Sequence, residues 1–460
     1  MTGILRYGAY LPAFRLDRGD IGAALGTSAG RGRRTVACYD EDTTSLGVEA
    51  ARRAMSGNGR KPATLHFATT LPAYADKTNA TAIHAALALD SDCFAGDMVG
   101  AVRGGFGAIR AAAQSSGLAV LSDIRTGLPG SADERTGGDA ATAFLFGDGD
   151  SVIAELLATA SSTAEFLDRW RAPGELASHV WEERFGVEMY LPLVTETVIR
   201  ALAAAGVEQA DHVVVSSPHL RAARAAVARF PSETVAGGLD GEVGNSGAAD
   251  VGLQLADVLD RARPNQTILV VLAADGCDVA VLRTTGALPG NRPALSVRDQ
   301  VGAGQPVSYG SYLTWRGLLP REPPRRPDPR PPSPPASARS HAWKFGLVGC
   351  RCRRCETAHL PPTRVCVRCG AVDEMSPERF ADRRGRVATC TVDRLTFSMA
   401  PPVIAAIVDF DEGGRLACEV ADARPEDIRI GTRVEMTFRR LHTADGIHNY
   451  FWKARPVEDH

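Results

Sequence analysis

Residues 320–335 place nine prolines among sixteen positions. Proline fixes φ and has no backbone N–H, so this run excludes both a helix and a central strand. The expected state is a polyproline II spacer of about 3.1 Å per residue, and a docking ligand for an aromatic groove is the alternative. The run divides the 460-residue chain unequally. At roughly 100–200 residues per domain, two or three domains are expected.

Composition excludes several classes of protein. Hydrophobic residues make up 44% and charged residues 23% of the chain, which are ordinary globular values. The net charge of −2 provides no basic field for collecting nucleic acid. No stretch approaches the roughly 20 apolar residues of a membrane helix, and the N-terminus lacks a signal-peptide pattern. We therefore expect a cytoplasmic protein that binds neither membrane nor nucleic acid.

Strand and helix patterns alternate through residues 1–290. Buried strands are predicted at 65–70, 118–123, 141–146, 213–217 and 267–274. Helices are predicted at 46–55, 80–89, 104–114, 191–205, 220–229 and 251–262. This alternation indicates an α/β architecture with largely parallel strands. A glycine also opens an apolar strand at both Gly138 and Gly276, which hints at two related halves.

Different patterns flank the proline run. The aromatic segment 309–319 is expected to pack on a neighbour as an arm or interdomain helix. After the run, short strands separated by turn residues predict a small all-β barrel. These strands are expected at 385–392, 402–409, 415–420, 433–438 and 450–453.

Four cysteines form two CxxC pairs, Cys352 with Cys355 and Cys366 with Cys369. Each pair can hold one side of a tetrahedron on a tight turn, and four thiolates form a closed shell typical of structural zinc. A redox dithiol would need only one isolated pair. Nearby Cys350 and His359 are not predicted as ligands. Arginines around the cluster leave nucleic-acid binding as an alternative, which the neighbouring acidic residues weaken.

The cysteine cluster and the barrel strands together resemble a known family. Gly349-Cys-Arg-Cys-Arg-Arg-Cys355, Leu360-Pro-Pro362 and Cys366-Val-Arg-Cys-Gly370 are similar to the acyl-CoA-associated, rubredoxin-like zinc ribbons fused to an OB-fold. The resemblance covers about 340–458. Members of that family partner thiolase-type enzymes, so a second thiolase-type enzyme is an expected partner.

The N-terminal part resembles the thiolase superfamily, and most closely its hydroxymethylglutaryl-CoA synthase branch. The resemblance rests on segments 39–44, 122–124, 137–141 and 243–249. It implies a fold of two βαβαβ halves in α-β-α-β-α layers, a CoA thioester as substrate, and a homodimer. We predict a thiolase-like domain (1–290), an arm and linker (291–345), a zinc ribbon (346–382) and an OB-fold domain (383–460).

The family's catalytic positions carry other residues in this chain. By the resemblance, Val102 stands where the family has its nucleophilic cysteine, Thr70 where it has a glutamate, and Ser216 where it has a histidine. The asparagine persists as Asn245. The resemblance therefore implies that the usual acyl-enzyme route is closed. Cys38, Cys93 and Cys277 are expected to be core thiols.

Two residues remain as candidates for catalysis. His219, just after Pro218, is the best substitute base, and a packing role is the alternative. Asn245 can polarise a thioester carbonyl with backbone amides near 100–105, or it can cap its glycine-rich turn.

Two functions follow. The first is an acyl-CoA-processing enzyme that forms or cleaves carbon–carbon bonds by aldol, retro-aldol or Claisen-type chemistry. The second is a non-catalytic acyl-CoA-binding or scaffolding subunit. The acyl group, the direction of reaction and the pathway do not follow from the sequence.

Overall fold

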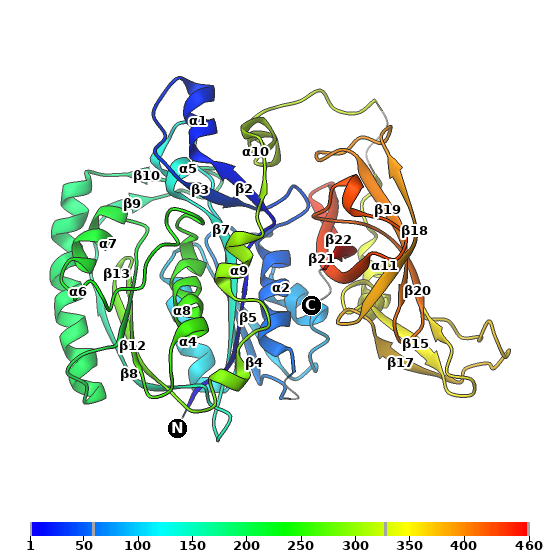
Figure 1. Ribbon diagram of the computed structural model, residues 1–460, viewed down its shortest axis with the longest axis horizontal. Helices are drawn as coiled ribbons and strands as arrows, with labels where there is room; N and C mark the ends of the chain where they lie inside the picture. The colour runs from blue at the N-terminus through cyan, green and yellow to red at the C-terminus, as the bar shows by residue number, and fades with distance from the viewer. Residues whose placement is uncertain (1, 58–59, 326–328, 458–460) are drawn as a thin grey trace. The chain divides into compact units, whose positions relative to one another are not determined.

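The computed structural model describes residues 2–57, 60–325 and 329–457 (Figure 1). It contains two compact units. The first unit comprises Met1–Cys38, Glu49–Thr81 and Asp90–Leu318, and the second comprises Tyr39–Val48, Ala82–Leu89 and Leu319–His460. Two short segments from the N-terminal part of the sequence therefore belong to the same unit as the C-terminal domains.

A nine-stranded sheet organises the first unit, in the order β11-β12-β13-β8-β1-β7-β6-β4-β5. Its strands are β1 (Gly3–Tyr10), β4 (Thr64–Thr69), β5 (Phe94–Val99), β6 (Leu118–Ile124), β7 (Asp139–Gly147), β8 (Ala154–Thr163), β11 (His212–Ser216), β12 (Thr267–Ala273) and β13 (Gly276–Thr284).

The expectation of largely parallel strands is wrong. Among the described strands of this sheet, β4 pairs in parallel with β5 and β6, and β11 with β12, whereas the other five pairs are antiparallel. The short turn at Ala274 and Asp275 explains one of these pairs, since a two-residue connection can join only antiparallel neighbours. Buried apolar runs on both kinds of strand look alike in sequence.

The sheet repeats one pairing pattern, which confirms the two related halves. The order β4-β6-β7-β1 combines one parallel pair with two antiparallel pairs, and β11-β12-β13-β8 combines them in the same sequence. The two halves join where Gly3 and Ile4 of β1 pair with β8. Both glycines that open these strands lie against the backbone of another segment. A Cβ on Gly138 would lie 2.0 Å from Val243 O, and a Cβ on Gly276 would lie 2.3 Å from Ser162 O.

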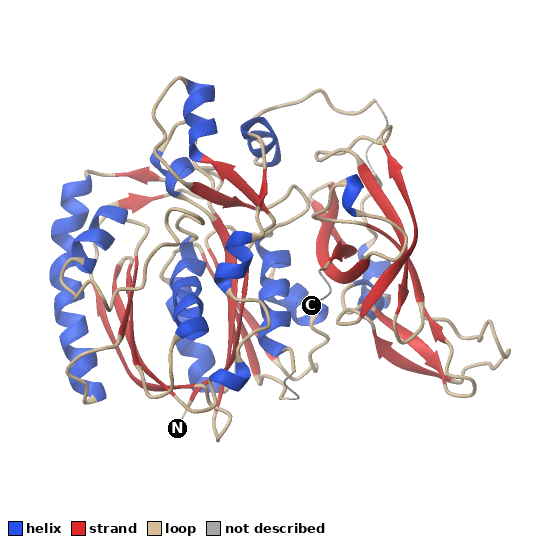
Figure 2. Ribbon diagram, in the orientation of Figure 1, coloured by secondary structure: helices blue, strands red, loops and turns tan. Residues whose placement is uncertain are grey.

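Helices complete a layered α-β-α-β-α arrangement (Figure 2). α4 (Gly104–Ser115) and α8 (Asp250–Arg261) lie between the two parts of the sheet and share its largest hydrophobic cluster. α6 (Glu183–Ala205) and α7 (Leu220–Val227) cover the outer face of β11, β12 and β13. The first-unit residues of α2 (Thr43–Met55) pack on β1, where Gly8 leaves no room for a side chain beside Ala50.

Smaller elements decorate the first unit. β2 (Phe14–Asp17), β3 (Arg33–Val36) and β14 (Gln305–Pro306) form one small sheet, and β9 (Arg169–Trp170) pairs with β10 (His179–Val180). The remaining elements are α1 (Arg18–Leu25), α5 (Ala132–Thr136), η1 (Gly247–Ala249), η2 (Pro289–Asn291), α9 (Val297–Gly302) and α10 (Tyr309–Trp315).

The predicted aromatic arm is α10, and it packs on the first unit. Tyr309 Oη donates to Glu134 Oε1 over 3.0 Å, and Tyr312 is fully buried beneath the guanidinium of Arg34. Arg316 follows the helix and pairs with the buried Asp139 carboxylate. These contacts hold the start of the linker against the unit that precedes it.

The proline run is irregular over most of its described length, as predicted. Residues 326–328 of the predicted linker lie outside the described residues. The exclusion of a helix is wrong at its end, where α11 (Pro334–Arg339) begins. Pro334 and Pro335 fit there because the first turn of a helix needs no intrahelical N–H donors.

The second unit contains two small sheets. β15 (Val348–Cys352) lies between β16 (Ala358–His359) and β17 (Met375–Arg379). The other sheet runs β20-β19-β18-β21-β22, with β18 (Arg384–Asp393), β19 (Val403–Phe410), β20 (Arg415–Glu419), β21 (Arg433–Ala444) and β22 (Ile447–Pro456). α3 (Ala80–Ala86), α12 (His341–Lys344) and η3 (Pro425–Asp427) complete the list of elements.

The five-stranded sheet of the second unit closes into a barrel. Val420 at the end of β20 bridges to Ala454 of β22, and the Ala421 N–H donates to Ala454 O over 2.8 Å. The sheet edges therefore meet around a core that includes Val387, Val408 and Val434. This is the predicted small barrel.

Candidate functional site

The four predicted cysteines converge in the second unit. Cys352 Sγ lies 3.7 Å from Cys369 Sγ, and Cys355 Sγ lies 3.5 Å from Cys366 Sγ. All four sulfur atoms lie within 4.8 Å of one another. A tetrahedral zinc with bonds of about 2.3 Å places its sulfur ligands about 3.8 Å apart, so the cluster fits this ion.

Local backbone geometry explains why two CxxC pairs can meet. Glu356 follows the first pair at φ 58°, and Gly370 follows the second at φ 71°, so each pair ends in a left-handed turn. The Arg368 N–H donates to Cys366 Sγ over 3.4 Å, which orients one sulfur. Cys350 faces elsewhere and accepts from the Thr363 N–H over 3.3 Å.

The start of α4 is the place where the resemblance puts a nucleophile. Val102 is buried there, two residues before the helix begins, and residues 97–105 contain no cysteine. A Cβ on Gly105 would lie 2.3 Å from Ala248 O. The beginning of α4 therefore touches η1, the turn that follows Asn245.

Thr70 lies at the end of β4 in a polar cluster. Its hydroxyl lies 2.8 Å from both carboxylate oxygens of Asp123, and Arg125 Nη1 donates to the same hydroxyl over 3.2 Å. The Ala248 N–H also donates to Asp123 over 3.0 Å. Burial raises the pKa of Asp123, and Arg125 opposes that shift. This places Thr70 beside a buried carboxyl group and a guanidinium.

Ser216 ends β11 and binds a second buried acid. Its Oγ donates to Asp250 Oδ2 over 2.6 Å, and Gln254 Nε2 donates to the same oxygen over 2.8 Å. The Ser246 N–H donates to the other oxygen over 3.2 Å. Burial raises the pKa of Asp250 to about 6. A carboxyl group with this pKa exchanges protons near neutral pH.

Asn245 is held between two loops. Its Nδ2 donates to Ser217 O over 3.1 Å, and its Oδ1 accepts from the Gly247 N–H over 3.1 Å. Its backbone is also fixed, since the Asn245 N–H donates to Thr136 O over 2.8 Å. A primary amide has two N–H donors, so one remains for a ligand.

His219 caps the N-terminus of α7. Its Nδ1 accepts from the Ala222 N–H over 3.1 Å, so the neutral ring carries its proton on Nε2. Within the part of the chain that the structure describes, that Nε2 is buried without a hydrogen-bond partner, and a Cβ on Gly186 would lie 2.5 Å from it. The ring also packs edge-on against Tyr190. The structure therefore gives His219 a packing and capping environment beside α6.

The thiols of the first unit lie in the core. Cys38, Cys93 and Cys277 are all buried. Burial raises the pKa of Cys93, with Asp92 and Asp90 adding to the effect, and burial raises the pKa of Cys277 to about 12. Thiols with raised pKa values contain little thiolate, which is the nucleophilic form.

The predicted residues lie around one set of strand ends. Ala248 of η1 links the Thr70–Asp123 cluster to the turn that carries Asn245, and Ser217 links Asn245 to the end of β11. Sequence reasoning missed Asp123 and Asp250. An acidic residue near the end of a predicted buried strand, as in Leu118–Ile124, was the signal that could have identified the first.

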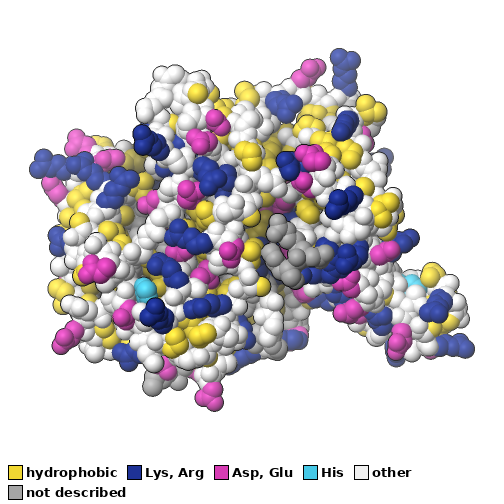
Figure 3. Space-filling view, viewed as in Figure 1, with side chains coloured by type: hydrophobic (Ala, Val, Ile, Leu, Met, Phe, Trp, Pro, Cys, Tyr) yellow, Lys and Arg dark blue, Asp and Glu magenta, His cyan; other side chains and the backbone are white. Residues whose placement is uncertain are grey.

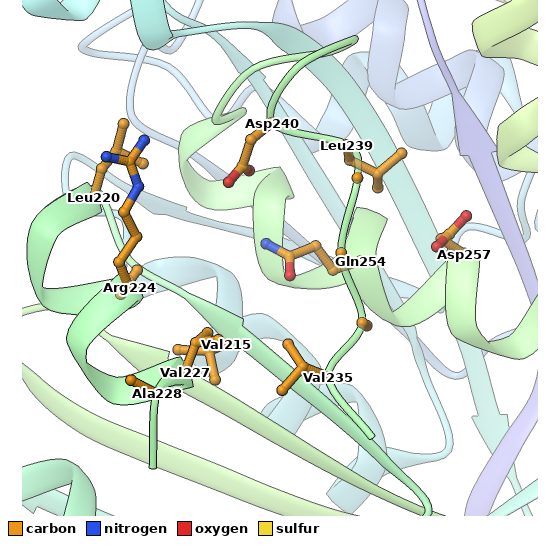
Figure 4. Close-up of a pocket in the computed structure, with 14 residues that line it drawn as sticks. Val215, Leu220, Arg224, Val227, Ala228, Val235, Leu239, Asp240, Gln254 and Asp257 are labelled. Atoms are coloured by element: carbon orange, nitrogen blue, oxygen red, sulfur yellow. The ribbon is translucent and has the colours of Figure 1, made fainter. Parts of the chain in front are cut away.

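A pocket of about 340 Å³ lies between α7, α8 and residues 235–240 (Figure 4). Val215, Val227 and Val235 form part of its apolar wall, and Arg224 and Gln254 add polar groups. Its lining contains none of the predicted catalytic residues. Gln254 nevertheless joins it to the site, because the same side chain binds Asp250.

Two further observations concern the charged side chains of one face and the helices. On the face shown in Figure 3, acidic side chains lie among the basic ones. Among the described helices, none has the length and apolar character needed to cross a membrane.

The C-terminal part of the chain matches a known family model and a known protein. Residues 378–439 match the family model described as ChsH2, C-terminal OB-fold domain. A DUF35 domain-containing scaffold protein from Methanocaldococcus jannaschii is 31% identical over 121 residues, which cover 25% of this chain and 85% of that protein.

The longer part of the chain matches curated hydroxymethylglutaryl-CoA synthases. The protein from Pyrococcus furiosus is 30% identical over 337 residues, covering 68% of this chain and 96% of the relative. The one from Archaeoglobus fulgidus is 29% identical over 342 residues, covering 69% of this chain and 98% of the relative.

Solved structures share the fold. A hydroxymethylglutaryl-CoA synthase complexed with CoA aligns with a TM-score of 0.59 at 17% identity, covering 68% of this chain and 89% of the other. A 3-oxoacyl-(acyl carrier protein) synthase III from Pseudomonas aeruginosa aligns with a TM-score of 0.56 at 21% identity, covering 62% and 98%. The chain belongs to the hydroxymethylglutaryl-CoA synthase family and carries a C-terminal domain of the DUF35 family.

Proposed function

We propose that the protein forms or cleaves carbon–carbon bonds beside a CoA thioester without forming an acyl-enzyme. The observation that carries this proposal is Asn245, whose amide is fixed at both ends and retains one N–H donor. An amide in this state can stabilise the enolate oxygen of a thioester. The relatives named as hydroxymethylglutaryl-CoA synthases support a CoA thioester as the substrate.

The proposed reaction needs only a base and an oxyanion-stabilising donor. In the cleavage direction, a base removes the proton from the hydroxyl of a 3-hydroxyacyl-CoA. The bond between carbons 2 and 3 breaks, a carbonyl product leaves, and Asn245 donates to the thioester enolate. The proton held by the base then returns to carbon 2. The reverse sequence is an aldol addition.

Asp250 is the base that the geometry favours. The resemblance places Ser216 where the family has a histidine. Ser216 donates to Asp250 over 2.6 Å, so a substrate proton can pass through the Ser216 hydroxyl to that carboxylate. A pKa of about 6 leaves Asp250 ionised at neutral pH yet able to accept a proton. His219 is the second candidate, but its Nδ1 already accepts from a backbone N–H.

The remaining parts of the proposal concern assembly. We propose a cytoplasmic homodimer in which zinc, bound by Cys352, Cys355, Cys366 and Cys369, stabilises the ribbon. The alternative function is a non-catalytic acyl-CoA-binding or scaffolding subunit for a second thiolase-type enzyme. It is favoured by the similarity of the C-terminal part to a protein named as a scaffold.

The test is mass spectrometry of a panel of 3-hydroxyacyl-CoA thioesters, and of acyl-CoA with aldehydes, incubated with the zinc-loaded full chain. A cleavage or condensation product that disappears in Asn245→Ala and Asp250→Asn supports the enzyme. His219→Ala separates the two candidate bases. His212→Gln, at the opposite end of β11, is the matched control and should keep full turnover. Retention of acyl-CoA with no turnover would favour the scaffolding function.

A further inference from the structure

The pocket between α7, α8 and residues 235–240 contains none of the side chains that the proposed reaction uses. Its volume of about 340 Å³ lies at the lower end of the range for small-molecule sites, so it fits a compact ligand. Aliphatic side chains form much of its lining, namely Val215, Leu220, Val227, Val235 and Leu239. The pocket therefore has the size and the apolar character to take a short hydrocarbon chain.

Two charged side chains of opposite sign line the same pocket. Among the described residues, neither the Arg224 guanidinium nor the Asp240 carboxylate makes a hydrogen bond or an ion pair. Arg18 donates to the Asp240 backbone carbonyl over 2.5 Å, and its charge acts on the carboxylate only at longer range. The third charge of the lining, Asp257, is already paired with Arg298 over 2.6 Å. Arg224 and Asp240 are exposed, so a ligand can reach both from solvent.

Gln254 connects the pocket to the proposed base. Its Nε2 donates to Asp250 Oδ2 over 2.8 Å, whereas its Oε1 accepts no hydrogen bond from the residues that the structure describes. In the view of Figure 4, the Gln254 amide lies between the charged groups of Arg224 and Asp240 above it and Val215 below it. A ligand N–H bound to Oε1 polarises the amide and strengthens its hydrogen bond to Asp250. A stronger hydrogen bond to the ionised carboxylate makes that carboxylate a weaker base.

We infer that this pocket binds a free aliphatic α-amino acid, which acts as an effector of the reaction centre. The ligand carboxylate pairs with Arg224, its ammonium group contacts Asp240 and Gln254 Oε1, and its side chain packs on the valines. Asp240 repels a simple carboxylate and Arg224 repels a simple amine, so a zwitterion is the charge class that matches both. The effector role rests on the proposed function, because it acts through Asp250, whereas the binding site does not.

The test measures binding to the zinc-loaded full chain by calorimetry with L-leucine, 4-methylpentanoate, 3-methylbutylamine and glycine. The second probe lacks the ammonium group, the third lacks the carboxylate and glycine lacks the side chain. Wild type should bind leucine about fivefold more tightly than either singly charged probe, the upper end for an exposed ion pair. It should bind leucine at least about tenfold more tightly than glycine, which buries no hydrocarbon chain. Equal binding of leucine and 4-methylpentanoate, or no binding of leucine, would overturn the inference.

Variants assign the two ligand charges to two residues. Arg224→Met should bind leucine no more tightly than wild type binds the amine, and Asp240→Asn no more tightly than wild type binds the acid. Arg221→Met removes an exposed arginine of the same helix that lies outside the pocket lining, and it should bind leucine as wild type does. Melting curves check that each variant folds. Unchanged leucine binding in both Arg224→Met and Asp240→Asn would place the leucine elsewhere and overturn the inference.

Turnover separates the effector role from binding. Saturating leucine should lower the rate about two- to fourfold in wild type, the size expected for strengthening one hydrogen bond to a charged group. Arg224→Met should keep the basal rate of wild type and lose the response to leucine. Leucine binding without any effect on turnover would overturn the effector role. If no thioester turns over, the proposed function fails, and the calorimetric comparison still decides whether the binding site exists.

Discussion

Two buried charge clusters, one in each unit, differ in how their cations are paired. In the second unit, Arg439 is fully buried, and its Nη1 lies 2.7 Å from Glu41 and 3.5 Å from Asp40 while its Nη2 pairs with Asp422. In the first unit, Arg125 lies 3.9 Å from Asp123, and Arg171 donates to the Thr70 carbonyl over 2.5 Å. Removing a guanidinium that contacts several buried carboxylates at short range is therefore expected to cost more stability than removing one whose acidic partner is more distant.

The cluster of the second unit also explains why segment 39–48 belongs to it. Lys453 of β22 lies 2.8 Å from Asp40 and 2.7 Å from Glu419. Burial alone would lower the pKa of Lys453, but Asp40, Tyr39 and Glu419 raise it above the usual value. Tyr450 completes the group by donating to Asp42 over 2.7 Å. The acidic segment that supported the family resemblance is here a partner for the barrel strands.

The largest expected effect comes from removing the zinc that we propose the four cysteines of the second unit bind. Binding of a structural zinc supplies about 10–16 kcal/mol of apparent free energy that is also folding free energy. Cys352→Ser, or a chelator, should therefore unfold the ribbon, measured by zinc stoichiometry and limited proteolysis. Cys350→Ser should keep one zinc per chain. Loss of zinc from both variants would show that the ligand set is wrong.

The next largest effect is expected from a substitution in the charge cluster around Arg439 in the second unit. Arg439→Met leaves three buried carboxylates without their shared partner, and removing one member of a buried ion pair costs about 3–5 kcal/mol. Urea unfolding measures this loss. Arg415→Met is the control on the same barrel, because its pair with Asp409 is exposed and such pairs contribute about 0–1 kcal/mol. Equal effects of the two variants would remove the distinction between the clusters.

On the catalytic side, Asn245→Ala removes the donor proposed for the enolate. Loss of one oxyanion donor lowers kcat by about 10²–10³, or about 2.7–4 kcal/mol. The measurement is turnover of the thioester identified by mass spectrometry, with urea unfolding as a check on folding. Asn291→Ala, which also removes a side-chain N–H bound to a backbone carbonyl, should leave turnover unchanged. Normal turnover in Asn245→Ala would leave Asn245 only as a cap of its turn.

Asp250 makes a pH-dependent contribution to stability. Because burial raises its pKa from 3.8 to about 6, the folded state binds this proton more tightly than the unfolded state. The resulting stabilisation is complete below pH 3.8 and is lost as pH rises through 6, a change of about 3 kcal/mol.

Comparison with Asp250→Asn isolates that change. The amide does not titrate, so the free energy of unfolding of the variant should gain about 2 kcal/mol relative to wild type between pH 4 and 7. Urea unfolding at several pH values measures it. Turnover should be lost in the same variant, since an amide cannot accept the proton. A constant difference in stability across this pH range would contradict the raised pKa.

The cysteine cluster of the second unit and the buried acids of the first unit differ in how far the sequence could predict them. The four cysteines that could hold a metal ion lie within Cys352–Cys369, so their spacing in the sequence predicts that they come together. The acids of the first unit depend on contacts across the fold: Ser216 and Asp250 are 34 positions apart, and Thr70 and Asp123 are 53 apart. Only the folded sheet brings them together, and no local pattern encodes that proximity.

Strand and helix positions followed from periodicity, whereas strand direction did not. Predicted strands 118–123 and 267–274 correspond to β6 and β12, and predicted helix 104–114 corresponds to α4. The expected parallel sheet failed because direction is set by connections, such as the tight turn after Ala273, and not by apolar runs. The role of the His219 ring could not be predicted from the sequence either. Its position after Pro218 did not reveal that its Nδ1 caps α7.

The smallest expected effect concerns the thiols of the first unit. Their substitution tests whether turnover requires a cysteine thiol. Cys93→Ala and Cys277→Ala should change turnover by less than about twofold, because raised pKa values keep both thiols protonated and a thiol is a poor nucleophile. Iodoacetamide at pH 7.5 should label neither in the folded, zinc-loaded protein, and peptide mass spectrometry measures this. If Cys277→Ala folded normally yet lost turnover, a covalent route through that sulfur would replace the proposal of enolate chemistry at Asn245. If both variants remain active, the reaction depends on the acids and amides at the strand ends, where Asp250 and Asn245 lie.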